Sequence, residues 1–273
     1  MSPAPGLPGV ERGYIIPIGG AEDHVEKPVV LERFARLCGG AEAVVIIIPT
    51  ASRRKEAGAR YVQTFERLGV GEAVSIPLRK RADCQRTNYL DALGRATGIF
   101  LTGGSQLRLS TILGGTPIAR RIRRRNAEGV HIAGTSAGAA IMPEHMIAAG
   151  KSGPTPRPAM VTLAPGLGLT NSLIIDQHFR QRDRLGRLLA AVSYNPFLIG
   201  VGLDEDTALF LGPDGVFEVV GSGVVTVVDP SALQHSSMSS AQLTDPVTLI
   251  GLTLHILTRG ARYNTVTRQA SLR

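Results

Sequence analysis

The sequence lacks tryptophan altogether, and only 4% of its residues are aromatic. Proteins that hold single-stranded nucleic acid commonly stack bases on aromatic side chains, so the composition disfavours that class. The two cysteines, Cys38 and Cys84, are too few for a disulfide framework, and neither lies in a metal-binding pattern. The longest apolar run, residues 43–48, has the length of a strand and is too short to cross a membrane. We therefore expect a cytoplasmic protein with no membrane or metal partner.

Positive charge is in excess, with 30 lysines and arginines against 22 acidic residues and a net charge of +8. Such an excess can attract an anionic partner. Its densest run, residues 120–125, is interpreted as the solvated face of a helix, with a rim that attracts carboxylates as the alternative. No nucleic-acid-binding motif accompanies the charge, so we expect no nucleic-acid partner.

Short apolar runs alternate with longer amphipathic segments over the first half of the chain. Strands are predicted at 14–18, 43–48, 74–77, 99–102 and 130–133, and helices at 27–37, 52–68 and 106–127. Ser52 is expected to cap the second helix, and Gly114 and Gly115 are expected to break the third. This alternation predicts an α/β fold with a doubly wound, mainly parallel sheet and helices on both faces.

The pattern changes after Gly202. Apolar segments at 203–211, 216–220, 224–228 and 249–257 follow one another without helices between them. They predict a C-terminal antiparallel extension of the same domain. Residues 1–12 are predicted to be a flexible tail rather than a signal peptide, so residues 13–273 are expected to form a single α/β domain.

A GTSAG sequence at 134–138 directly follows a predicted strand. This is the pattern of a nucleophile elbow, a sharp strand-to-helix turn that exposes a serine. Small neighbours are needed there because bulky side chains would clash at the turn and cover the hydroxyl. Ser136 is therefore the candidate nucleophile, and a tight turn or a phosphate-binding loop is the alternative.

A serine hydroxyl needs an adjacent base. His178 ends an apolar strand, and we expect it at the same edge of the sheet as Ser136; His24 is the second candidate. His131 lies inside a predicted strand and is expected to be structural. His145 is expected on the helix after Ser136, which would carry it away from the site.

The base in turn needs an acid that orients it. The run Asp204–Glu205–Asp206 offers candidates, and on an extended segment Glu205 points opposite to the two aspartates, so only one side can face His178. Asp176, two residues before His178, is another candidate. The chain order of serine, histidine and acid differs from that of α/β-hydrolases, so we predict a serine hydrolase of another group.

Arginines are concentrated after the candidate base, at positions 180, 182, 184 and 187. Arginine binds carboxylates through two parallel hydrogen bonds, so this cluster could hold an acidic substrate. The alternative is a basic helix whose arginines are solvated.

Five segments together are more specific than any single motif. They are GGAED at 19–23, TGGSQLR at 102–108, GTSAGA at 134–139, DQHF at 176–179 and GLDEDTA at 202–208. The chain resembles the cyanophycinase family from about residue 13 to residue 262. The resemblance implies a cytoplasmic serine exopeptidase, commonly a homodimer, with a fold like that of class I glutamine amidotransferases. It would cut cyanophycin, a poly-aspartate that carries arginine on each β-carboxyl, into β-aspartyl-arginine dipeptides through an acyl-enzyme.

The same resemblance implies roles for individual residues. Ser136 would be the nucleophile, His178 the base and Glu205 the orienting acid, and the amides of Gly104 and Ala137 would form the oxyanion hole. The implied substrate-binding residues are Gln106, Asp176, Gln177, Arg182, Arg184 and Arg187. No metal or cofactor is implied.

The chain departs from the family at two places. Ser105 stands where the family usually has aspartate or asparagine, and residues 151–158 lack the expected glycine- and glutamate-rich sequence. Two alternatives to a cyanophycinase are an aspartyl dipeptidase-like hydrolase of short acidic peptides and a noncatalytic binding protein on the same scaffold.

Overall fold

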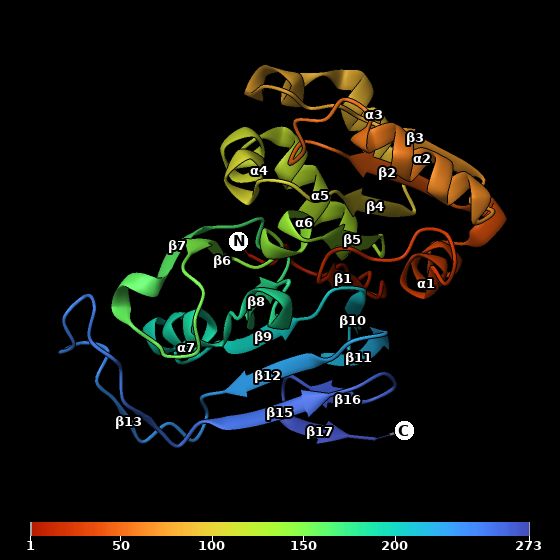
Figure 1. Ribbon diagram of the computed structural model, residues 1–273. Helices are drawn as coiled ribbons and strands as arrows, with labels where there is room; N and C mark the ends of the chain where they lie inside the picture. Colours follow the sequence, from red (N-terminus) through yellow and green to blue (C-terminus); the bar gives the residue numbers. More distant parts are fainter. Residues whose placement is uncertain (1, 273) are drawn as a thin grey trace.

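The computed structural model describes residues 2–272 and is built on a nine-stranded mixed sheet (Figure 1). Five neighbouring strands, in the order β1-β5-β4-β2-β3, pair in parallel. They are β1 (Ile15–Ile18), β2 (Val44–Ile48), β3 (Glu72–Ser75), β4 (Gly98–Leu101) and β5 (His131–Thr135). All five predicted strands are therefore present, with their ends shifted by a few residues at most.

Helices cover both faces of this parallel half, because its strands are apolar on both sides. In β2, Val45 and Ile47 face one core, whereas Ile46 and Ile48 face the other. The first core is covered by α1 (Val29–Leu37) and α2 (Ala57–Arg67), and the second by α3 (Thr87–Arg95), α4 (Gln106–Leu113) and α5 (Pro117–Ala127). The predicted doubly wound α/β fold is confirmed.

The predicted antiparallel extension is also present, but it is divided between two sheets. The nine-stranded sheet continues beyond β1 through β10 (Thr207–Leu211), β11 (Val216–Gly221), β16 (Arg262–Asn264) and β17 (Gln269–Ser271). A second, four-stranded sheet has the order β15-β12-β9-β8, with β8 (Leu173–Gln177), β9 (Ile199–Leu203), β12 (Val225–Asp229) and β15 (Thr253–Leu257). The parallel strands β8 and β9 are joined through α7 (Leu185–Tyr194).

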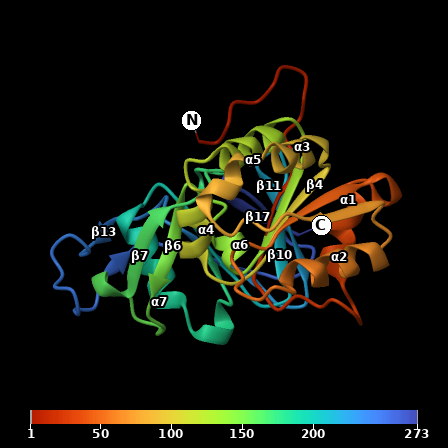
Figure 2. The ribbon, with the colours of Figure 1, turned by 90° about the horizontal axis from the view of Figure 1, so that it is seen from above.

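The remaining elements lie at one end of the molecule. The hairpin of β6 (His145–Gly150) and β7 (Val161–Pro165) lies near α7, opposite the end that carries α1 and α2 (Figure 2). The short strands β13 (His235–Ser236) and β14 (Leu249–Ile250) pair with each other.

Three local predictions are wrong. Ser52 does not cap α2, which begins at Ala57; the Ser52 hydroxyl instead accepts a hydrogen bond from the amide of Arg54. His145 is not on a helix, because α6 (Ala137–Ala140) ends after four residues and His145 begins β6. The segment 203–211 is not one strand, since residues 204–206 turn the chain from β9 in one sheet to β10 in the other.

The predicted break between α4 and α5 is confirmed and has a clear cause. Gly114 and Gly115 interrupt the helix, and Thr116 starts the next one with its hydroxyl accepting from the amide of Ala119. Pro117 occupies the first helical position, where its missing N–H costs nothing. The helix α3, which follows a 3₁₀ turn at Arg81–Gln85, was not predicted, because it buries only Leu93 and its apolar pattern is weak.

The N-terminal segment 2–14 contains no helix or strand, and Ser2 contacts the backbone carbonyl of Gly168. Met1 of the predicted tail and Arg273 at the end of the predicted domain lie outside the described residues. Within residues 2–272, every helix is too short or too polar to cross a lipid bilayer.

Candidate active site

Ser136 lies at the sharp turn between β5 and α6, with φ 52° and ψ −111°. The two glycines of the motif are needed because other backbone passes close to both. A Cβ on Gly138 would lie 2.2 Å from the carbonyl oxygen of Leu101, and one on Gly134 would lie 2.6 Å from that of Gly138. The amide of Ser136 donates to the carbonyl of Ile18 at 2.9 Å, which ties the turn to the end of β1.

His178 reaches this serine, with its Nε2 2.9 Å from the Ser136 hydroxyl oxygen. It follows β8 in the four-stranded sheet, so the expectation that both residues share one sheet edge is wrong. The two sheets meet at this point, where the His178 amide donates to the carbonyl of Gly19 after β1. The second candidate base, His24, instead contacts the hydroxyl of Thr64.

Glu205 is the acid that contacts the imidazole, with its Oε1 2.6 Å from Nδ1 of His178. Its neighbours point elsewhere because residues 204–206 form a turn: Asp204 accepts from Arg180, and Asp206 accepts from Ser222. Of the acids considered from the sequence, only Glu205 contacts the candidate base.

Burial lowers the pKa of His178 below its ordinary value of 6.5, while its hydrogen bond with Glu205 raises the pKa and opposes part of that effect. Nearby Arg182 and Arg184 also lower it. The imidazole is therefore neutral near pH 7, which is the form that can accept a proton from serine. Gly20 leaves room for the ring, since a Cβ there would lie 2.4 Å from Cε1 of His178.

The two candidate oxyanion donors lie on the segments that border Ser136. Ala137 is the first residue of α6, where an amide has no partner within the helix. Gly104 has φ +144° and packs on Ala51, and the preceding Gly103 is so close that its Cβ would lie 3.4 Å from that of Ser136.

Arg184 and Arg187 are buried against Asp176, whose side chain is fully inaccessible. Arg187 makes two hydrogen bonds to that carboxylate, one of them 2.5 Å from Nε to Oδ2, and Arg184 lies 3.3 Å from Oδ1. Arg184 also donates to the backbone carbonyl of Gln177, and burial lowers its pKa to about 10. The alternative of a solvated basic helix is therefore wrong for these two arginines.

The remaining predicted substrate residues differ in their surroundings. The Ser136 hydroxyl lies 3.3 Å from Oε1 of Gln177, which places that amide at the serine. Gln106 donates to the carbonyl oxygens of Ile147 and Ala148 in β6. Arg182 is exposed, and within residues 2–272 its side chain makes no hydrogen bond or ion pair.

Glu22 was not singled out from the sequence, although it follows the glycine pair after the first strand. It is 5% exposed and accepts hydrogen bonds from the hydroxyls of Tyr61, at 2.6 Å, and Thr135, at 2.5 Å. Because Thr135 immediately precedes Ser136, this carboxylate fixes the start of the elbow.

A cavity of about 390 Å³ opens beside the elbow at Thr102 and Gly103. It extends along the start of α2, where it is lined by Ser52, Arg54, Glu56, Ala57, Arg60 and Tyr61. Over the described part of the chain, no three histidine, cysteine or acidic side chains are grouped so that they could hold a metal ion.

Comparison with known proteins gives independent evidence for the family of this chain. The chain is 44% identical to a cyanophycinase of Geminocystis herdmanii over 94% of this chain and 96% of that protein. It is 42% identical to a cyanophycinase of Trichormus variabilis over 94% of this chain and 87% of that protein.

Two solved structures share the fold. A peptidase from an acI-B1 Actinobacterium has a TM-score of 0.69 at 22% identity, covering 94% of this chain and 98% of that one. A peptidase E-like protein from Listeria monocytogenes has a TM-score of 0.51 at 18% identity, covering 77% and 98%. Residues 15–219 match the model of peptidase family S51. With this match over most of its length, the chain belongs to peptidase family S51.

Proposed function

We propose that this serine-type peptidase hydrolyses cyanophycin and releases β-aspartyl-arginine dipeptides. The observation that carries the proposal is the continuous hydrogen-bonded series from Ser136 through His178 to Glu205, at 2.9 and 2.6 Å. It begins at the elbow, where Gln177 lies beside Ser136 and is held by the buried Arg184, in a chain that is 44% identical to a cyanophycinase.

In the proposed mechanism, the Ser136 hydroxyl attacks a backbone carbonyl of the poly-aspartate while Nε2 of His178 takes its proton. Glu205 keeps the imidazole in the tautomer with the proton on Nδ1 and stabilises the imidazolium. The amides of Gly104 and Ala137 receive the developing oxyanion. His178 then protonates the leaving amine, and it later activates the water that hydrolyses the acyl-enzyme.

For substrate binding we propose that the arginines have different roles, one contacting the substrate and two holding neighbouring residues in place. Arg182 is exposed near His178 and would pair with a carboxylate of the substrate. Arg184 and Arg187 hold Asp176 and the Gln177 backbone, and so fix the position of Gln177 beside the serine. Gln106 and Gln177 complete the proposed substrate-binding set.

We further propose a homodimer in the cytoplasm. The edge strand β15 supports the dimer, because Leu254 and Ile256 are 53% and 57% exposed on it. An exposed apolar edge strand favours pairing with another chain. Light scattering after size exclusion should give twice the chain mass, and Ile256→Lys should shift it to the monomer. A monomeric wild type would contradict the proposal.

The deciding experiment is product analysis after incubation with insoluble cyanophycin and, separately, with aspartyl dipeptides. The wild type should release β-aspartyl-arginine from cyanophycin, and Ser136→Ala should lower the rate by at least about 10³-fold with unchanged folding. Cleavage of the dipeptides alone would support the dipeptidase alternative. Equal, negligible rates for the wild type and Ser136→Ala on both substrates would support a noncatalytic protein.

A further inference from the structure

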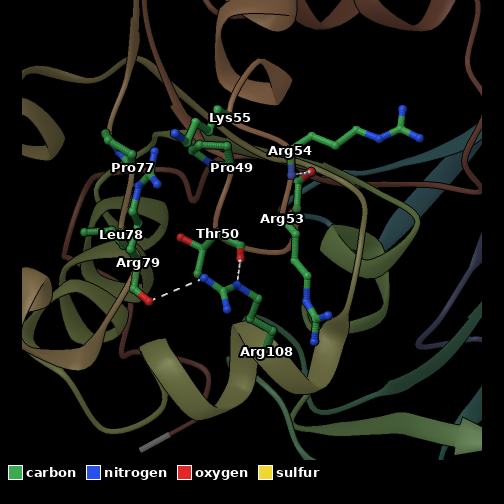
Figure 3. Close-up of a pocket in the computed structure, with 10 residues that line it drawn as sticks. Pro49, Thr50, Arg53, Arg54, Lys55, Pro77, Leu78, Arg79 and Arg108 are labelled. Atoms are coloured by element: carbon green, nitrogen blue, oxygen red, sulfur yellow. Dashed lines mark hydrogen bonds between the residues drawn. The ribbon is translucent and has the colours of Figure 1, made fainter.

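A second, smaller cavity lies at the carboxyl ends of β2 and β3 and has a strongly basic lining (Figure 3). Its volume is about 150 Å³. That is well above the roughly 10–15 Å³ needed for one water molecule and below the roughly 300 Å³ of a small-molecule pocket. The space therefore suits a small group, such as one carboxylate with a short stem.

Cations dominate the lining of this cavity. Lys55 and Arg79 border it together with Arg53, Arg54 and Arg108, and no aspartate or glutamate among the described residues lines it. The side chain of Arg79 runs past Pro77 toward Lys55, whereas that of Arg54 extends away from the group (Figure 3). Arg108 closes the wall by donating to the carbonyl oxygens of Thr50 and Arg79. A carboxylate would be attracted here, and a guanidinium would be repelled.

Among the described residues, Thr50 contributes an unpaired buried polar group to the lining of this cavity. It is 97% buried, and within residues 2–272 its hydroxyl oxygen has no hydrogen-bond partner. A buried hydroxyl without a partner is costly, so native structures seldom keep one unless another molecule supplies the bond. Thr50 lines the basic cavity, so an anion bound there could accept a hydrogen bond from this hydroxyl.

The basic cavity is connected with the catalytic region through a shared loop. Ala51, next to Thr50, accepts a hydrogen bond from the amide of Ser105, and Gly104 packs on its carbonyl. Ser52 and Arg54 line both this cavity and the larger one that reaches Gly103 beside the elbow. The larger cavity, which reaches the elbow, therefore borders the basic cavity along Ser52 and Arg54.

We propose that this cavity is a carboxylate subsite for a residue of the cyanophycin chain remote from the bond that is cut. We call it the basic subsite and define it by Thr50, Lys55, Arg79 and Arg108. The inference rests on the proposed function, because each residue of that polymer carries a free arginine carboxylate beside its guanidinium. A site whose charged lining residues are all cations binds the carboxylate and excludes the guanidinium, so it fixes the orientation of the branch.

The test uses Ser136→Ala as a background that binds substrate without consuming it. Isothermal titration measures the Kd of a trimer of β-aspartyl-arginine, and of the same trimer with its arginine carboxylates amidated. Arg79→Gln and Lys55→Met should each weaken the unmodified trimer about tenfold, and Thr50→Val should weaken it several-fold, because charged hydrogen bonds are lost. The amidated trimer should bind equally well with and without these changes.

Arg36→Gln is the matched control, since it removes one exposed positive charge on α1. It should leave both trimers unaffected, and thermal unfolding should show that all variants keep the wild-type fold. Unmodified trimer binding that is as insensitive to Arg79→Gln and Lys55→Met as to Arg36→Gln would overturn the subsite.

Two further results distinguish a free-anion site from a substrate subsite, and failure of the basic subsite from failure of the proposed function. Inorganic phosphate is tested in the same way. If Arg79→Gln abolishes phosphate binding but leaves trimer binding unchanged, the cavity is a free-anion site and the substrate assignment is wrong. If the wild type releases no dipeptide from cyanophycin, the proposed function fails. If it does, but the long polymer is cut at the same rate in Thr50→Val and Arg79→Gln, only the basic subsite fails.

Discussion

Asp176→Asn should destabilise the protein strongly. Its position next to Gln177 and two residues before the candidate base would instead favour an effect on substrate binding alone. The carboxylate is fully inaccessible and is held between the buried guanidinium groups of Arg184 and Arg187. The substitution keeps the shape of the side chain but removes its charge. Two cations are then left in a buried site without the anion that compensates them.

The magnitude follows from the geometry of this network. Removing one partner of a buried ion pair costs about 3–5 kcal/mol, because the remaining charge stays desolvated. Arg187 makes two hydrogen bonds to Asp176 and Arg184 makes one, so the cost should fall within that range. At about 2 °C per kcal/mol for a chain of this size, Tm should fall by about 6–10 °C.

Calorimetry and urea unfolding at pH 7 would measure the effect, with Asp91→Asn as the control. Asp91 is exposed on α3, so the same chemical change there should shift Tm by less than about 2 °C. If Asp176→Asn keeps the wild-type Tm and raises only the KM for branched substrates, then the carboxylate is directed at the substrate and the reasoning fails.

Three further predictions concern the base and the elbow. Because burial depresses the pKa of His178, kcat/KM should rise with pH through a pKa below 6.5 and be level near pH 7. Glu205→Gln should move this rise to still lower pH, because the hydrogen bond from Glu205 raises the pKa of His178. The same substitution should lower the level value of kcat/KM by about 10⁴-fold. A rise that moves to higher pH would contradict this electrostatic assignment. Gly20→Ala should reduce kcat/KM at least about 100-fold, because its Cβ would lie 2.4 Å from the imidazole and a misplaced base loses that much; near-normal kinetics would show that the ring can move without loss. Glu22→Gln should cost about 1–3 kcal/mol in urea unfolding, because one hydroxyl of the Tyr61 and Thr135 pair would face an amide N–H₂; unchanged stability would mean that these two hydrogen bonds do not stabilise the fold.

Several features could be predicted from the sequence because their causes are local. The run of β2 is apolar throughout, so its residues can alternate between two cores, and that pattern predicts a strand covered on both faces. The elbow at Ser136 is local in part, since Gly134 is required by the carbonyl of Gly138 four residues further on, whereas Gly138 is required by Leu101 of β4. The end of α4 at Gly114 follows from the glycine pair and from the capping threonine just after it.

The residue pattern left the choice between Glu205 and Asp176 open, although the family resemblance implied Glu205, and the contact itself depends on the tertiary structure. Asp176 is near His178 in the sequence, and Glu205 follows β9, the strand that pairs with β8. Asp176, however, accepts a hydrogen bond from Arg187, eleven residues further along the chain. Likewise, Ser136 and His178 meet because two different sheets abut, and the sequence pattern had placed them on one sheet. Amphipathic patterns fix which residues form a strand and which side of it is apolar. They do not fix which strands pair or which partner a buried charge finds, because those contacts join distant segments and form only when the whole core packs.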